Sequence, residues 1–163
     1  MSNNKDLRGS RGLADINHLP LRTNMSCYCL APSGLTLEAG DKNDVETAGA
    51  TVDTVIDGLF YSATALADEN VTLFRSEDDS VLQAADTTCY YVFTIDASDA
   101  VRLYKQVDGV AAYPAIPETG EAPFAVLKVV TVAVTFTPGT TDYDASGVTS
   151  TFTDVRNVPA AVV

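Results

Sequence analysis

The chain has 163 residues, enough for one domain with a hydrophobic core, and 46% of them are hydrophobic, a usual value for a globular protein. Its 22 acidic side chains outnumber the 10 basic ones, giving a formal net charge of −12. Nucleic acid is therefore not an expected partner, since phosphate binding needs a basic surface. The longest apolar run, residues 125–134, is too short to cross a membrane, and the polar, basic N-terminus does not read as a secretory signal. We therefore expect a soluble chain that is not exported.

Residues 1–25 are predicted to form an extended N-terminal arm, and residues 26–163 a single β-rich domain. The arm holds four basic and two acidic side chains, a net charge of +2, which leaves −14 on the body. Such asymmetry, with frequent apolar residues around Pro20, favours a docking arm over a frayed terminus without a partner. The residues expected to dock are Arg8, Arg11, Leu13, Ile16, Leu19, Leu21 and Arg22.

The first part of the body reads as short strands. We predict strands at 35–38 and 71–74, and one helical turn at 64–70. Between them, residues 51–63 are two β-rich segments joined by Asp57-Gly58. An Asp-Gly pair between such segments is a strong hairpin signal, because a type I′ turn needs positive φ at both central positions.

The second part is predicted to begin with a β-meander. Residues 90–95 and 101–107 are β-rich segments joined by a polar turn, and Asp108-Gly109 predicts a further hairpin. Residues 124–136 are apolar on both faces, which is typical of the most buried strand, and 148–155 predict the last one. The fold class expected is all-β, an antiparallel sandwich or barrel-like meander with an extended arm.

Signals for catalysis and for metal binding are weak. The single histidine, His18, lies in the arm, where no rigid element would hold it beside a nucleophile. Three cysteines fit neither a disulfide framework nor a zinc spacing, and Cys27 and Cys29, two apart on a strand, should be small buried side chains. We expect no enzyme, no cofactor and no metal.

Acidic clusters occur in predicted turns, where Asp is common for its hydrogen bonds to the backbone. Calcium is the functional alternative, but the first cluster lacks the glycine and terminal glutamate of an EF-hand loop. Solvated turns are the favoured reading. The clusters are Asp41/Asp44/Glu46, Glu77/Asp78/Asp79 and Asp142/Asp144.

Three segments carry a resemblance to a known family: residues 51–62, 122–130 and 136–152. In the last and most specific, Phe-Thr-Pro-Gly-Thr-Thr is followed by Ala-Ser-Gly-Val-Thr and an aromatic residue. Together they resemble small structural proteins of tailed bacteriophages that are encoded among head genes. The resemblance covers roughly residues 31–160, so it does not include the arm.

The resemblance implies a capsid decoration, or cement, protein. Such proteins lie on the outer surface of the virion, often as homotrimers, and clamp neighbouring subunits of the major capsid protein. The chain would be made in the host cytoplasm, would bind neither membrane nor nucleic acid, and would use its arm as the capsid anchor.

Two other classes remain open. A head-fibre or tail-associated adhesive protein would contact the host surface through exposed aromatics such as Tyr113 and Tyr143. A small enzyme or sugar-binding sandwich is the third class, weakened because the chain has no tryptophan for stacking on sugars. Copy number separates the two virion roles, since cement needs about one copy per symmetry site and a fibre needs few.

Overall fold

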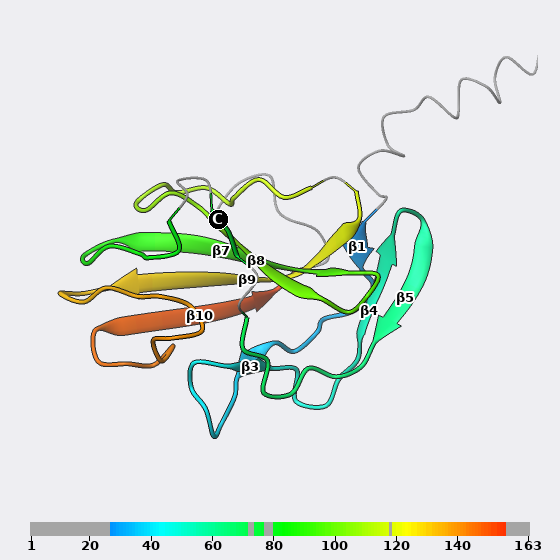
Figure 1. The fold of residues 1–163 in the computed structure, drawn as a ribbon, viewed down its shortest axis with the longest axis horizontal. Helices are drawn as coiled ribbons and strands as arrows, with labels where there is room; N and C mark the ends of the chain where they lie inside the picture. The colour runs from blue at the N-terminus through cyan, green and yellow to red at the C-terminus, as the bar shows by residue number, and fades with distance from the viewer. Residues whose placement is uncertain (1–26, 72–73, 77–79, 118, 156–163) are drawn as a thin grey trace, which may run out of the picture.

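The structure, a computed structural model, describes residues 27–71, 74–76, 80–117 and 119–155. These residues form strands, turns and loops without a helix, so the predicted all-β, sandwich-like class is confirmed (Figure 1). The strands are β1 (Tyr28–Cys29), β2 (Thr36–Leu37), β3 (Val45–Glu46), β4 (Val52–Ile56), β5 (Leu59–Ala63), β6 (Phe74–Ser76), β7 (Thr88–Asp96), β8 (Val101–Lys105), β9 (Glu121–Thr131) and β10 (Val148–Asp154).

The largest sheet has five strands in the order β10-β9-β7-β8-β6. Its pairs are antiparallel except for β6 with β8, which is parallel. The central strands β7 and β9 are buried almost throughout, because core packs on one side and a loop crosses the other. Burial on both faces explains why their sequences are nearly continuous apolar runs.

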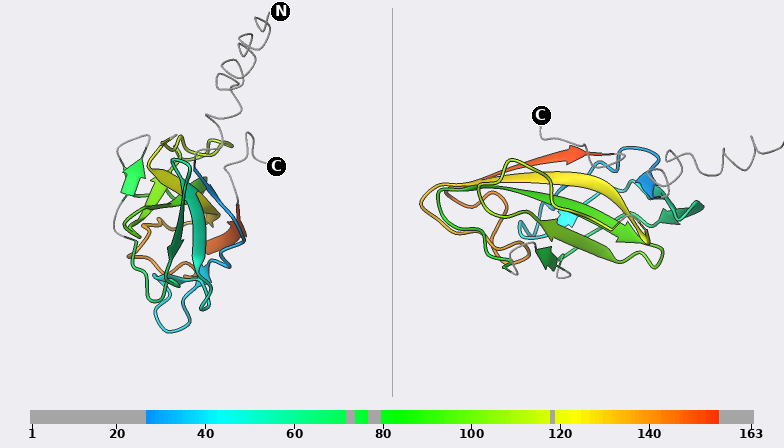
Figure 2. Two further views of the ribbon diagram at one scale, coloured as in Figure 1. Left: turned by 90° about the vertical axis from the view of Figure 1, so that its right-hand side faces the viewer. Right: turned by 90° about the horizontal axis from the view of Figure 1, so that it is seen from above.

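Two smaller sheets complete the fold: β1-β4-β5, and β2 with β3. In the end-on view of Figure 2, β4 and β5 lie in front of the larger sheet. The main core joins residues of all three sheets, among them Cys29, Val45 and Leu103. Six aromatic side chains form a continuous part of it, with neighbouring ring centroids 5.4–6.4 Å apart: Tyr91, Phe93, Phe124, Phe136, Tyr143 and Phe152.

The hairpin predicted at Asp57-Gly58 is confirmed as β4–β5. Asp57 has φ 51° and Gly58 has φ 81°, the positive values that a type I′ turn requires. Residues 148–154 form β10, as predicted, and β9 is the predicted long buried strand, shifted to begin at Glu121 and end at Thr131. The strand predicted at 71–74 is found as β6, three residues on at Phe74–Ser76.

The hairpin predicted at Asp108-Gly109 is wrong. The chain turns there, with Gly109 at φ 78°, but no strand follows. The next segment contains Pro114, which lacks the N–H that a central strand would donate. It crosses the outer face of the five-stranded sheet as a loop, where Tyr113 and Ile116 pack on Val92, Tyr104 and Val126.

The helical turn predicted at 64–70 is also wrong. The Thr47 hydroxyl accepts a hydrogen bond from the Leu66 N–H at 3.0 Å, and Glu69 exchanges two backbone hydrogen bonds with Val45. These long-range partners take the N–H groups of Leu66 and Glu69, and Asp68 has φ 52°, so the segment is not a helical turn.

All three cysteines are buried and carry free thiols, as expected. Burial raises the pKa of Cys89 to about 12, and burial likewise raises the pKa of Cys29. Because the thiolate is the reactive form, a thiol reagent at pH 8 should label at most Cys27 in the native protein and all three cysteines in denaturant. Absorbance of the released aryl thiolate measures this, and rapid native labelling of two or more cysteines would contradict the buried placement.

Candidate interaction surface

The sheet β1-β4-β5 presents an apolar row on its outer face. Tyr28 lies opposite Val55, and Val55 lies opposite Phe60. The alternate residues of β4, Val52, Thr54 and Ile56, are buried, so the row points the other way, toward solvent. Its outermost member, Phe60, is 63% exposed.

One leucine extends this row. Leu30 donates its N–H to the Asp53 carbonyl at 2.8 Å, so it continues the pairing of β1 with β4 and shares the face of Tyr28. Leu59, which is 62% exposed, pairs with Ile56 and therefore lies on the other face of the hairpin. We call the surface made by Tyr28, Leu30, Val55 and Phe60 the tip surface. Contiguous exposed apolar side chains of this kind mark interaction sites, whereas isolated ones are ordinary.

The tip surface ends at an open sheet edge. β5 is the last strand of its sheet, and among the described residues it pairs only with β4. In a hairpin with a two-residue turn, the pair flanking the turn exchanges hydrogen bonds and the next pair does not. Phe60 and Ser62 therefore direct their N–H and C=O groups outward, which makes β5 a template for another strand.

The rim of the tip surface is acidic. Asp53 accepts a hydrogen bond from the Ser62 hydroxyl at 2.5 Å, and Asp57 accepts one from the Gly120 N–H at 3.2 Å. Neither carboxylate forms an ion pair with a cation of the described ranges. The surface therefore combines apolar side chains with uncompensated negative charge.

The charged cluster at the end of the five-stranded sheet where β9 begins is structural. Glu121 accepts hydrogen bonds from Arg102 at 2.6 Å, from the Thr94 hydroxyl at 2.6 Å and from the Tyr104 hydroxyl at 3.1 Å. Arg102 also lies 3.0 Å from Asp96. Both carboxylates of the cluster, Glu121 and Asp96, are thus held by donors of the same fold.

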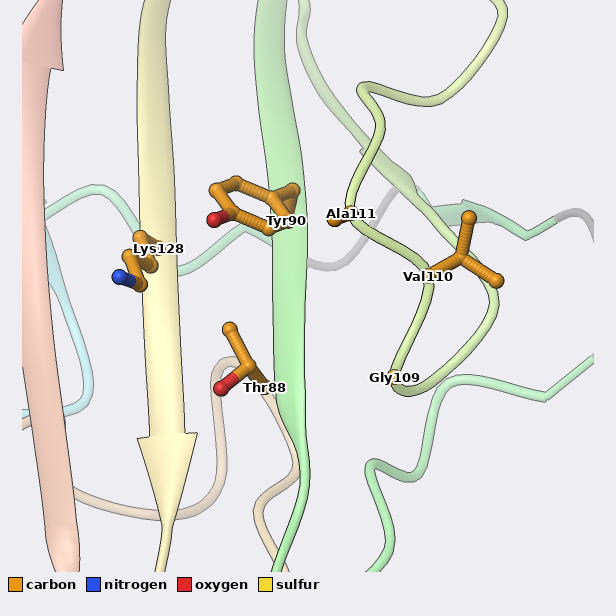
Figure 3. A pocket seen from close by; sticks show the side chains of 6 residues that line it. All are labelled: Thr88, Tyr90, Gly109, Val110, Ala111 and Lys128. Carbon is orange, nitrogen blue, oxygen red and sulfur yellow. The ribbon is translucent and has the colours of Figure 1, made fainter. Parts of the chain in front are cut away.

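A shallow hollow of about 220 Å³ opens on the outer face of the five-stranded sheet. Figure 3 shows Lys128 and Tyr90 on neighbouring strands, with the loop after β8 on the other side. The Lys128 ammonium lies 6.0 Å from the centre of the Tyr90 ring, at the limit of a cation–π contact. No carboxylate or histidine lines the hollow, and its titratable side chains are Lys128 and Tyr90. The lining residues are Thr88, Tyr90, Gly109, Val110, Ala111 and Lys128.

The fold brings the first and third acidic clusters of the sequence together, since the Tyr143 N–H donates to the Lys42 carbonyl at 2.9 Å. Asp44 is buried and accepts a hydrogen bond from the Asn70 amide at 2.7 Å, while Asp144 pairs with Lys42 on the surface. Residues 77–79 lie outside the described residues. Within the described ranges no group of three or more His, Cys, Asp or Glu side chains is placed to hold a metal ion. The same ranges contain no helix long and apolar enough to cross a membrane.

The residues predicted to anchor the arm, Arg8, Arg11, Leu13, Ile16, Leu19, Leu21 and Arg22, lie outside the described residues, as does His18. The tyrosines predicted for an adhesive surface are both placed. Tyr143 is 1% exposed and packs between Phe136 and Phe152, so its prediction as an exposed anchor is wrong. Tyr113 is half-buried with its ring edge 5.7 Å from the Tyr90 ring.

Comparisons with protein-family models, with curated proteins and with solved structures found no match to this chain in any of the three. The tip surface is thus the feature of the described structure that points most directly to a function.

Proposed function

We propose that the chain is a capsid decoration protein of a tailed bacteriophage, which binds the outer surface of the head and stabilises contacts between major capsid subunits. The observation that carries the proposal is the tip surface, an exposed apolar row beside an open strand edge. Such a surface suits lasting protein contacts, because it removes apolar area from water and satisfies the edge backbone.

The remaining chemistry supports a binding role. The Glu121 carboxylate accepts hydrogen bonds from three side chains of its own fold. A cement protein needs no reactive group, since it stabilises a shell by binding only the assembled lattice, with many copies acting together. The family resemblance of residues 136–152 points to the same role.

The adhesive alternative is weakened, because one of the two tyrosines named for it is buried. Tyr143 belongs to the core, where burial raises its pKa and its hydroxyl has no hydrogen-bond partner among the described residues. Tyr113 is half-buried against Tyr90. A host-facing aromatic patch therefore has less support than a contact surface within a shell.

Capsid binding tests the proposed function. Purified full-length protein should co-sediment with expanded empty capsids and saturate at a copy number set by the lattice, whereas a variant lacking residues 1–23 should not bind if the arm is the anchor. Stoichiometry is measured by quantitative gel analysis of the pellet. Failure of the full-length protein to bind sinks the cement role, and saturation at only a few copies per capsid favours the fibre role.

A further inference from the structure

We propose that the tip surface is the docking surface for residues 19–26 of a sister copy, which add an antiparallel strand to β5. The proposal concerns how copies of this chain associate. It stands on the described edge and on the sequence of the segment. It assigns the tip surface and residues 19–26 to contacts between copies, so any contact with a capsid would be made by the assembled oligomer and by residues 1–18 of the arm.

The segment has the pattern of a half-buried strand. In an extended segment Leu19, Leu21, Thr23 and Met25 share one face, and Pro20, Arg22, Asn24 and Ser26 share the other, so three of the four side chains on the first face are apolar. Paired with β5, its apolar side would continue the row that runs from Tyr28 to Phe60. Eight extended residues span about 26 Å at about 3.3 Å each, longer than the five residues of β5.

Charge favours the segment over a second tip surface as the occupant. Two tip surfaces packed against each other would bring Asp53 and Asp57 of one copy near those of the other, and like charges are disfavoured across an interface. The arm instead carries a net charge of +2, including Arg22 within the segment itself. The segment therefore offers apolar side chains for the row and, in Arg22, a cation for the acidic rim.

The direction of the chain favours a sister copy over the same copy. The Asp57 N–H lies 3.4 Å from the Cys27 sulfur, so Cys27 sits at the end of the hairpin. β1 then runs away from that end, since Tyr28 faces Val55 and Cys29 faces Thr54. The preceding residues join β1 at the hairpin end, with β4 between β1 and β5. Reaching β5 of the same copy would require the chain to reverse and cross β4.

A neighbour with its hairpin end nearby needs no such reversal. The segment runs toward the hairpin end, and β5 runs away from its own, so the two strands meet antiparallel. Each copy then gives one strand and receives one, a head-to-tail contact that forms a ring when the rotation between copies closes. The homotrimer that the family resemblance implies would be one such ring.

Paired single-cysteine variants test the contact between chains. Thr23→Cys and Ser62→Cys are co-expressed as separate chains and mildly oxidised, and the control pair is Thr23→Cys with Thr151→Cys, which is exposed on β10. We expect a disulfide-linked pair of chains with Ser62→Cys and at least about tenfold less with Thr151→Cys. Equal yields for the two pairs, or a crosslink formed only when Thr23→Cys and Ser62→Cys share one chain, would overturn the proposal.

Oligomer size provides a second test that needs no capsid. Sedimentation equilibrium of the full-length protein should show a closed oligomer, and either removal of residues 1–26 or Phe60→Asp should raise its dissociation constant on the order of a hundredfold. Val132→Asp is the matched control, because Val132 is 62% exposed but lies after β9. A monomeric full-length protein, or loss of association in Val132→Asp to the same extent, contradicts the assignment, and circular dichroism verifies that each variant is folded.

Discussion

Gly147→Ala is expected to lower the free energy of unfolding by about 3 kcal/mol, because it combines backbone strain with overpacking. Gly147 has φ +85°, a conformation that side chains other than glycine rarely adopt. A Cβ atom there would lie 2.6 Å from the Val132 carbonyl oxygen and 2.9 Å from a Val134 methyl group. That carbonyl belongs to the backbone, and the N–H of the same residue donates to the Gly147 carbonyl at 2.8 Å, so the carbonyl has little freedom to shift.

Gly109→Ala is the matched control for this prediction. Gly109 has φ +78°, but a Cβ atom would meet nothing within 4 Å. It therefore carries the strain without the clash, and we expect a loss of about 1 kcal/mol. Urea unfolding followed by circular dichroism measures both variants. Equal losses would show that the close approach at Val132 relaxes at no cost.

Local turn chemistry predicted one hairpin correctly and one wrongly, for a physical reason. Asp57-Gly58 is flanked by two segments that both form strands, so the turn and the pairing agree. Asp108-Gly109 forms its turn, but its N–H groups bond elsewhere, with Gly109 donating to the Thr88 carbonyl at 2.9 Å. β8 pairs with β7 on one side, and on its other side it pairs with β6, a parallel strand from an earlier part of the chain. A non-local pairing of this kind leaves no signal in the sequence around the turn.

The tip surface was only partly accessible from sequence. Once Asp57-Gly58 fixes the register, the alternation of Val52, Thr54 and Ile56 predicts which face of β4 is buried. Phe60 then falls on the opposite face. The sequence does not predict that β5 is the edge strand of its sheet, because that depends on how β1, β4 and β9 meet in three dimensions.

The specific segment 136–152 owes its pattern to packing. Phe136, Tyr143 and Phe152 contact one another in the aromatic core, and Gly139 and Gly147 have positive φ. The Tyr143 carbonyl accepts a hydrogen bond from the Ser150 hydroxyl at 2.7 Å. The segment that carries the most specific part of the family resemblance therefore also fixes a long loop onto the core.

Glu121→Ala is expected to cost about 3 kcal/mol of unfolding free energy, because removing one member of a buried ionic cluster leaves its partners unpaired. Arg102, Thr94 and Tyr104 all donate to this carboxylate. Arg102 would keep Asp96, whereas the two hydroxyls would lose the acceptor within their reach. Partial burial raises the pKa of Asp96, but hydrogen bonds from Ser98 and Ala100 and the charge of Arg102 outweigh it and lower the pKa below its usual value. Asp96 therefore stays ionised and holds Arg102 when Glu121 is absent.

Two further variants separate charge from shape at this position. Glu121→Gln keeps an acceptor oxygen and should cost about half as much as Glu121→Ala, since hydrogen bonds to neutral groups are weaker than those to charged ones. Lys42→Ala removes the exposed pair with Asp144 and should change stability by less than about 0.5 kcal/mol. Guanidinium unfolding at pH 7 measures all three. If Glu121→Ala costs no more than Lys42→Ala, the cluster does not hold β7, β8 and β9 together, and their registry depends on the apolar core alone.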